Sequence, residues 1–168
     1  MILADPPYRY DFSVSSNRRV ENHYPTMSLE AICALPVADV ATDNAALFLW
    51  VPAPKLPQGL AVLTAWGFAY KTVAVWVKPS IGMGYYFRSR QEFLLVGVRG
   101  SGMVPSPDKR VDSVIAAARG RHSEKPGVVR EIIERMYPGL PKLELFARKQ
   151  APGWVAWGNE VASPMGAA

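Results

Sequence analysis

Hydrophobic residues along the chain gather in short continuous runs, and between some of these runs they recur at helical spacing. The continuous runs have the length of buried strands and cover residues 1–4, 45–51, 68–77, 92–98, 142–147 and 154–157. Helical spacing predicts helices over residues 29–32 and 56–66, and a third helix that opens at residues 123–126. Strands that alternate with helices predict an α/β fold with a mainly parallel sheet.

Residues at the ends of these segments support the predicted boundaries. Ser28 is a suitable N-cap for the first helix, and Gly67 stands where the second helix is expected to end. Pro126 suits the first turn of the third helix. The expected buried face of that helix consists of Val129, Ile132, Ile133 and Met136. Residues 9–26 and 100–107 show no period and are expected to be loops, whereas the state of residues 111–119 is left open.

Length and composition indicate one globular unit. The chain has 168 residues, of which 49% are hydrophobic and 20% are charged. We expect a single domain over residues 1–161 and a frayed tail of small residues at 162–168. The first apolar run is short for a buried strand, so the strand is expected to begin upstream of Met1. No signal-peptide pattern is visible and no apolar run approaches the ~20 residues of a membrane span, which predicts a cytoplasmic protein.

Charge and cysteine content narrow the classes of function. The formal net charge of +5 fits an anionic partner such as nucleic acid, although a surface that is merely basic explains it equally well. Cys33 is the single cysteine and lies in an apolar stretch, so we expect it in the core rather than as a nucleophile. The chain has only two histidines, His23 and His122, so Cys33 cannot form a zinc cluster of the Cys/His type with them, and no metal site is predicted.

Three charged residues, Asp5, Lys78 and Arg148, lie just past predicted strands. Ligands of open α/β sheets bind outside the carboxyl ends of the strands. We therefore expect these three side chains to converge on one edge of the sheet.

The motif Asp5, Pro6, Pro7 and Tyr8 suits methyl transfer to an aromatic amine. The lone pair of such an amine is delocalised into the ring, so acceptors for its two N–H groups favour the form that attacks carbon. The carboxylate of Asp5 can accept one N–H and the carbonyl of Pro6 the other, while Pro7 stiffens the turn. Tyr8 offers a flat face to an extruded base. A plain turn at a strand end is the alternative interpretation.

Basic residues crowd the first predicted loop and the middle of the chain. The candidates for nucleic-acid binding are Arg18, Arg19, Lys78, Arg88, Arg90, Lys109, Arg110 and Arg121. Tyr85, Tyr86 and Phe87 stand among them, and phosphate contacts combined with stacking faces suit nucleic acid. The alternative is a solvated basic face over a buried aromatic cluster.

Several segments, taken together and in this order, resemble one known family. They are residues 3–8 (LADPPY), 21–28 (ENHYPTMS), 76–79 (WVKP), 82–88 (GMGYYFR), 94–100 (LLVGVRG), 122–126 (HSEKP), 143–148 (LELFAR) and 153–160 (GWVAWGNE). In this order the chain resembles the MT-A-seventy family of adenine-N6 methyltransferases over nearly its whole length. That family includes the catalytic subunit of the eukaryotic mRNA adenosine methyltransferase and many small bacterial and phage proteins.

The resemblance implies a fold, a methyl donor and a set of binding residues. The implied fold is the Rossmann-like S-adenosylmethionine-dependent methyltransferase fold in permuted motif order, with the catalytic strand first and the donor-binding strand last. S-adenosylmethionine is the implied donor, no metal is needed, and residues 5–8 take the adenine beside the methyl group. The residues implied to bind the donor are Asp5, Lys125, Phe146, Arg148, Asn159 and Glu160. Taken alone, Lys125 would be interpreted as a solvated lysine in a first helical turn.

The resemblance also bears on the substrate. Tyr8 favours DNA, because the mRNA enzyme has tryptophan at this place and tyrosine is usual among bacterial DNA adenine methyltransferases. Adenosine in RNA and the N4 amino group of cytosine are alternatives, although an aspartate in first place favours adenine over cytosine. Another alternative is a non-catalytic nucleic-acid-binding partner of a methyltransferase pair, but such partners lose the acidic motif. A single compact domain has little surface with which to recognise a target sequence, which favours a homodimer. The resemblance also implies a bacterial or phage-encoded protein.

Overall fold

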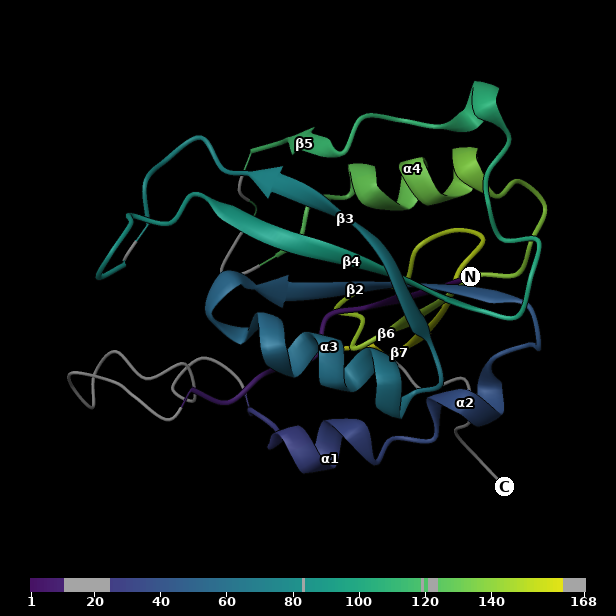
Figure 1. Ribbon diagram of the computed structural model, residues 1–168, viewed down its shortest axis with the longest axis horizontal. Helices are drawn as coiled ribbons and strands as arrows, with labels where there is room; N and C mark the ends of the chain where they lie inside the picture. The colour runs from purple at the N-terminus through teal and green to yellow at the C-terminus, as the bar shows by residue number, and fades with distance from the viewer. Residues whose placement is uncertain (11–24, 83, 119, 121–123, 162–168) are drawn as a thin grey trace.

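The computed structural model describes residues 1–10, 25–82, 84–118, 120 and 124–161. Its centre is a seven-stranded sheet in the order β5-β3-β4-β2-β1-β6-β7 (Figure 1). The strands are β1 (Ile2–Ala4), β2 (Ala45–Pro52), β3 (Ala69–Val77), β4 (Gln91–Arg99), β5 (Val114–Ala116), β6 (Leu143–Leu145) and β7 (Val155–Trp157). The helices are α1 (Leu29–Cys33), α2 (Val37–Val40), α3 (Leu56–Ala65) and α4 (Val128–Met136), with short 3-10 turns η3 (Ala53–Lys55) and η4 (Pro107–Lys109).

The sheet is mainly parallel, as the pattern predicted. β1 pairs in parallel with β2 and with β6, β6 with β7, and β3 with β5. Within the described strands, β4 alone runs antiparallel to both of its neighbours, β2 and β3. The amino end of β4 therefore lies at the edge where the other strands end.

Helices cover both faces of the sheet and bury the two faces of β2. Leu47, Leu49 and Val51 pack in one cluster with residues of α1 and α3. Phe48 and Trp50 point the other way and pack in a second cluster that includes α4. Because strand residues alternate between faces, a strand covered on both sides reads as a continuous apolar run. All residues from Ala45 to Val51 are buried accordingly.

Local signals place the helices on the first face. The hydroxyl of Ser28 accepts the backbone N–H of Ala31 at 3.2 Å and so caps α1, as predicted. The indole N–H of Trp66, at the end of α3, donates to the carbonyl of Ile32 at 2.9 Å and ties the two helices together. Gly67 follows at φ +80°, the left-handed conformation that ends a helix.

Two predicted boundaries were wrong by a few residues. The third helix was expected to open at residues 123–126, but α4 begins at Val128 and leaves Lys125 and Pro126 in the segment before it. The sixth strand was expected to run to Ala147, but β6 ends at Leu145 because Phe146 adopts φ +60°. The four-residue helix α2 and strand β5 were not predicted.

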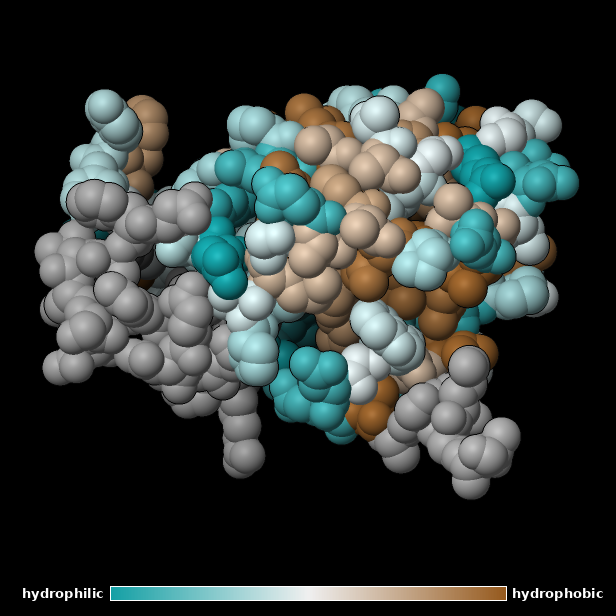
Figure 2. Space-filling model, turned by 90° about the horizontal axis from the view of Figure 1, so that it is seen from below, coloured by the Kyte–Doolittle hydropathy of each residue, from teal (hydrophilic) through white to brown (hydrophobic). Residues whose placement is uncertain are grey.

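The proposed tail at 162–168 lies outside the described residues. The single domain over residues 1–161 stays a prediction. Among the helices of the described part, none has both the length and the apolar character to cross a membrane. Seen from the side of α1 and α3, polar and apolar residues are interspersed on the surface (Figure 2).

Candidate active site

A cavity of about 650 Å³ opens at the edge where β1 and β2 end and β4 begins. Asp5 follows β1, Lys78 follows β3 and Arg148 lies just beyond β6, and all three line the cavity, as predicted. The cavity wall also includes Tyr8, Tyr10, Pro52, Glu92, Lys125, Phe146, Asn159 and Glu160. Chain segments far apart in sequence thus meet here because the sheet order places their strands side by side.

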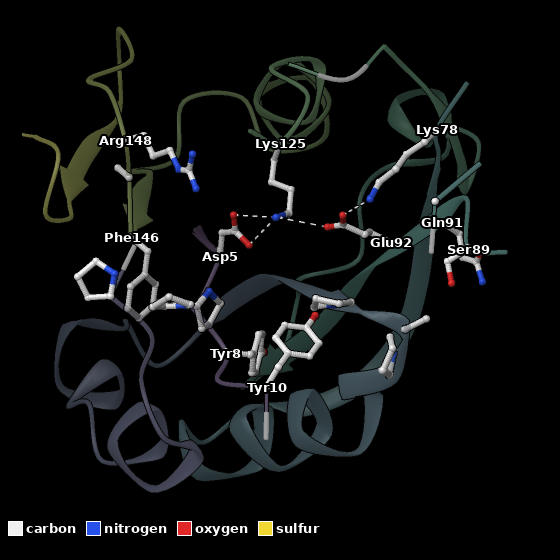
Figure 3. Close-up of a pocket in the computed structure, with 18 of the residues that line it drawn as sticks. Asp5, Tyr8, Tyr10, Lys78, Ser89, Gln91, Glu92, Lys125, Phe146 and Arg148 are labelled. Atoms are coloured by element: carbon white, nitrogen blue, oxygen red, sulfur yellow. Dashed lines mark hydrogen bonds and ion pairs between the residues drawn. The ribbon is translucent and has the colours of Figure 1, made fainter. Parts of the chain in front are cut away.

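Four charged side chains form a row across one side of this cavity (Figure 3). The ammonium of Lys125 lies 2.9 Å from a carboxylate oxygen of Asp5 and 3.3 Å from one of Glu92. Lys78 forms an ion pair with the same Glu92 from the other side. The side chains of Lys125 and Glu92 are each only 15% exposed, so this is a largely desolvated network of alternating charges.

Burial and charge set the protonation of this row. Burial raises the pKa of Asp5 above its ordinary value, and the neighbouring Lys125 opposes the rise. Burial alone would lower the pKa of Lys125, but Asp5 and Glu92 outweigh it, so the pKa of Lys125 is raised. Burial would raise the pKa of Glu92, but Lys125 and Lys78 outweigh it and hold that pKa below its ordinary value. Lys125 is therefore a cation and Glu92 an anion at neutral pH.

The turn after β1 is fixed by backbone hydrogen bonds. The N–H of Tyr8 donates to the carbonyl of Pro6 at 2.9 Å, and the N–H of Met27 donates to the carbonyl of Pro7 at 2.8 Å. A carbonyl has two lone pairs, so Pro6 keeps one for a second donor. The residues that precede α1 thus brace the turn against the cavity. Such bracing holds an acceptor in place before a ligand arrives.

Tyr8 is more deeply buried than its predicted stacking role suggested. Its ring lines the cavity but is only 5% exposed, and it packs in the core cluster with Ile32. Burial raises the pKa of its phenol, which stays neutral. Its hydroxyl is buried and has no hydrogen-bond partner among the described residues. Tyr10 stands beside it, on the side of the cavity opposite the charged row (Figure 3).

The segments after β6 and β7 form the remaining wall. The ring of Phe146 packs edge-to-face on Trp157 at 5.5 Å between centroids. The guanidinium of Arg148 lies 3.7 Å from a carboxylate oxygen of Glu160. Gly158 allows the two segments to approach, because a Cβ there would lie 2.2 Å from the carbonyl oxygen of Ala147. The residues implied to bind the donor are thus brought together.

The candidate nucleic-acid residues are dispersed. Lys78 lies in the cavity wall, and Arg90 donates to the carbonyl of Lys78 at 3.0 Å at the base of the β3–β4 loop. Arg88 donates to the carbonyl of Gly82 at 2.9 Å within that loop. Lys109 and Arg110 follow the carboxyl end of β4, which lies at the opposite edge of the sheet. The three others, Arg18, Arg19 and Arg121, lie outside the described residues.

Reasoning from the sequence missed Glu92 and Tyr10. Glu92 belongs to an apolar run that was interpreted only as a strand, and the direction of that strand could not be read from its composition. A charged residue at the start of a buried run is the signal that was available. Cys33 packs against the core and its pKa is raised by burial, in line with its predicted structural role. The described residues contain no group of His, Cys, Asp or Glu side chains suited to a metal ion.

Comparisons with known proteins agree with this geometry. Residues 1–160 match the model of the MT-A70 (MT-A-seventy) family. A Mycoplasma protein named Type II methyltransferase M.MunI is 35% identical to the chain, over 96% of the chain and 77% of that protein. The N(6)-adenosine-methyltransferase MT-A70-like protein of Drosophila melanogaster is 30% identical, and the human N(6)-adenosine-methyltransferase catalytic subunit METTL3 is 29% identical. The chain spans only 26% and 28% of the length of these two.

Proposed function

The chain belongs to the MT-A70 family, and on this premise we propose that it transfers a methyl group from S-adenosylmethionine to the N6 amino group of adenine in nucleic acid. The observation that carries the proposal is the placement of Asp5 and the Pro6 carbonyl on a braced turn in the wall of the cavity. Both the name of the human relative and that of the Drosophila relative contain N(6)-adenosine-methyltransferase.

The residues of the cavity fit the proposed donor. Its volume of about 650 Å³ lies within the range of roughly 300–1,000 Å³ for small-molecule sites. Lys125 and Arg148 are cations that suit the donor carboxylate. Asn159 and Glu160 supply polar groups for ribose hydroxyls and adenine, and Phe146 a flat apolar face. When bound, S-adenosylmethionine would supply the methyl group on a sulfonium.

Asp5 and Pro6 would act on the acceptor amine. One N–H of the adenine amino group donates to the carboxylate of Asp5 and the other to the carbonyl of Pro6. Both acceptors are held before the substrate enters, so little reorganisation is needed as positive charge develops on the nitrogen. The raised pKa of Asp5 brings its carboxyl closer to accepting the proton that the nitrogen finally releases.

Lys125 and Glu92 would position Asp5. Lys125 bridges the two carboxylates, and Glu92 is in turn held by Lys78. A donor carboxylate that enters beside Lys125 would join this row and compete with Asp5 for the ammonium. Occupation of the donor site would then free an oxygen of Asp5 for the adenine.

The proposal favours DNA over RNA. The chain spans 77% of the relative named Type II methyltransferase, against about a quarter of the relatives named as N(6)-adenosine-methyltransferases. A cytoplasmic location and a homodimer, both predicted from the sequence, remain predictions. Sedimentation of the free protein would measure the second.

The test is product analysis. The protein is incubated with labelled S-adenosylmethionine and unmethylated DNA or RNA, which is then digested to nucleosides. We expect N6-methyladenine in DNA, no product with Asp5→Ala, and normal product with Asp39→Ala, the same change at an exposed carboxylate on α2. N6-methyladenosine in RNA alone would change the substrate and keep the chemistry.

Measurement of donor binding distinguishes the proposed enzyme from the remaining alternative, a non-catalytic nucleic-acid-binding protein. A non-catalytic partner of a methyltransferase pair would yield no product and bind no donor. Calorimetry with S-adenosylmethionine and with the demethylated product measures this directly. Absence of both product and donor binding would overturn the proposed function.

A further inference from the structure

Three consecutive aromatic side chains at the turn of the β3–β4 loop are almost fully exposed. Tyr85, Tyr86 and Phe87, here named the aromatic tip, are 84%, 97% and 85% exposed. The alternative interpretation from the sequence, a solvated basic face over a buried aromatic cluster, is therefore wrong. Removal of large aromatic rings from water lowers the free energy. Three exposed rings in a row therefore indicate a surface that contacts a partner.

The loop that carries the aromatic tip is held in shape. Its two arms are joined by hydrogen bonds from the N–H of Lys78 to the carbonyl of Arg90 at 2.7 Å, and from the N–H of Gly82 to that of Ser89 at 2.8 Å. The turn itself is tight, because a Cβ on Gly84 would lie 1.9 Å from the carbonyl oxygen of Phe87. The backbone of the two arms is therefore fixed before a partner binds, which lowers the entropy lost on binding.

The base of the same loop forms part of the candidate active site. Lys78, Gly82, Ser89 and Gln91 all line the cavity. In Figure 1 the loop projects beyond the edge of the sheet at which β2 and β3 end. The aromatic tip therefore belongs to a loop that starts in the wall of the cavity and projects beyond this edge of the sheet.

The charge of the loop indicates the chemistry of the partner. Residues 78–91 contain Lys78, Arg88 and Arg90 and no acidic residue. Two such loops from two copies of the chain would repel each other, whereas a polyanion would be attracted. Exposed aromatic faces together with cations are the combination that binds unpaired bases and their phosphates.

We propose that the aromatic tip stacks on the bases next to the adenine that enters the cavity. This inference rests on the proposed function and names the surface that holds the substrate strand. Stacking would stabilise the neighbours of an adenine that has left its own stack, and the arginines would contact the adjoining phosphates.

The test compares variants that remove rings, keep rings, or move the tip. Tyr86→Ala removes one ring and Tyr86→Phe keeps its face. Gly84→Ala keeps all three rings but must open the turn. Tyr70→Ala, at a ring 47% exposed at the far end of β3, is the matched control. Affinity for a labelled single-stranded oligonucleotide and for its duplex is measured by fluorescence anisotropy, and S-adenosylmethionine binding by calorimetry.

We expect Tyr86→Ala and Gly84→Ala to weaken oligonucleotide binding roughly tenfold or more, because one lost stacking contact has about that effect. Tyr86→Phe and Tyr70→Ala should bind as the wild type does, and all four variants should bind the donor normally. A larger loss on single strands than on duplex would indicate stacking on a free strand. A larger loss on duplex, relieved by a mismatch opposite the target adenine, would indicate insertion into the duplex.

Equal oligonucleotide binding by Tyr86→Ala and the wild type would overturn the inference. So would unchanged binding accompanied by a change in sedimentation, which would make the tip a protein interface. Neither readout requires methyl transfer. A protein that binds oligonucleotides through the tip but neither binds the donor nor yields methylated product would therefore contradict the proposed function and leave the tip as a surface that binds nucleic acid.

Discussion

Lys125 Nζ lies 2.9 Å from the carboxylate of Asp5, although the two residues are 120 positions apart in the chain. The contact joins the turn after β1 to the segment before α4 across the candidate active site. Glu92 takes the opposite side of the same ammonium. The residue proposed to receive the adenine is thereby fixed to a residue proposed to bind the donor, so the two ligands are expected to influence each other's affinity.

Replacement of Lys125 by methionine should affect both folding and donor binding. Lys125→Met leaves two largely buried carboxylates without their shared cation, and removal of one partner of such a network costs about 3–5 kcal/mol of unfolding free energy. The matched control is Lys149→Met, which breaks an exposed pair with Glu124 and should cost less than about 1 kcal/mol. Urea unfolding measures both values, and calorimetry should show weaker donor binding for Lys125→Met alone. Equal stability of the two variants would mean that the buried row contributes nothing to the fold.

Replacement of Glu92 by glutamine should lower turnover and leave donor affinity nearly unchanged. The amide keeps the size of the side chain but no longer neutralises Lys125 and Lys78, so Asp5 is held less firmly. A small displacement of a reacting group can reduce kcat on the order of 10²-fold. Glu131→Gln, an exposed change on α4, is the matched control. Single-turnover rates at saturating donor would test this, and a rise in KM with unchanged kcat would contradict the positioning role.

Much of the fold could be predicted, because burial on two faces leaves a mark in the sequence. The run from Ala45 to Val51 is apolar throughout since its residues alternate between two cores. The cap at Ser28 and the stop at Gly67 are local effects and were confirmed. The antiparallel direction of β4 was not predictable, because an apolar run is the same when read in either direction. The position of Glu92 at the active edge depends on that direction.

The environment of individual side chains was harder to predict than their location. Lys125 resembles a solvated lysine in sequence, and its burial depends on Asp5 and Glu92, which reach it from distant segments. Tyr8 was predicted to present a free face, but helix α1 packs against it and leaves it 5% exposed. The residues around the donor were identified by the resemblance to a family. The local sequence around each of them did not distinguish it from an ordinary strand end.

The pH dependence of methyl transfer should show the raised pKa of Asp5. Asp5 must be a carboxylate to accept the amino group, so activity should fall as the pH drops through its pKa, and this pKa lies above the ordinary value of about 3.9. Glu92 raises the pKa of Asp5, so Glu92→Gln should shift the acid limb of kcat/KM to lower pH. Lys125 lowers it, so Lys125→Met should shift the limb to higher pH. Shifts in the same direction for both variants would show that Asp5 does not control the limb.

The free energy of unfolding in acid should depend on the charge of Glu92. Folding lowers the pKa of Glu92, whereas it raises that of Asp5. The pKa of Glu92 is lowered on folding, so its contribution to stability is fully present above the unfolded pKa of about 4.3 and is lost as the pH falls through the lower folded value. Glu92→Gln should therefore flatten the decline of unfolding free energy below this pH. Urea unfolding between neutral pH and the acid range would measure the slope. A slope equal to that of the wild type would mean that folding does not change the pKa of Glu92.

The close approach between the segments after β6 and β7 should be essential for donor binding. A Cβ at Gly158 would lie 2.2 Å from the carbonyl oxygen and 2.6 Å from the nitrogen of Ala147, and these are backbone atoms that no rotamer change can move. Gly158→Ala must therefore displace Ala147 and its neighbours Phe146 and Arg148. Overpacking of this kind typically costs 1–3 kcal/mol of unfolding free energy. Because the displaced residues line the cavity, donor affinity should fall along with stability.

Gly127→Ala is the matched control for this prediction. Gly127 has φ −60° at the start of α4, and the nearest atom to an added Cβ is 4.0 Å away. Alanine fits this conformation and restricts the unfolded chain, so the variant should equal or exceed the wild type in stability by about 0.4–1 kcal/mol. Urea unfolding and donor calorimetry are applied to both variants. If Gly158→Ala bound the donor as tightly as Gly127→Ala does, then Phe146 and Arg148 would have no part in the donor site, and the wall beyond β6 would need another role.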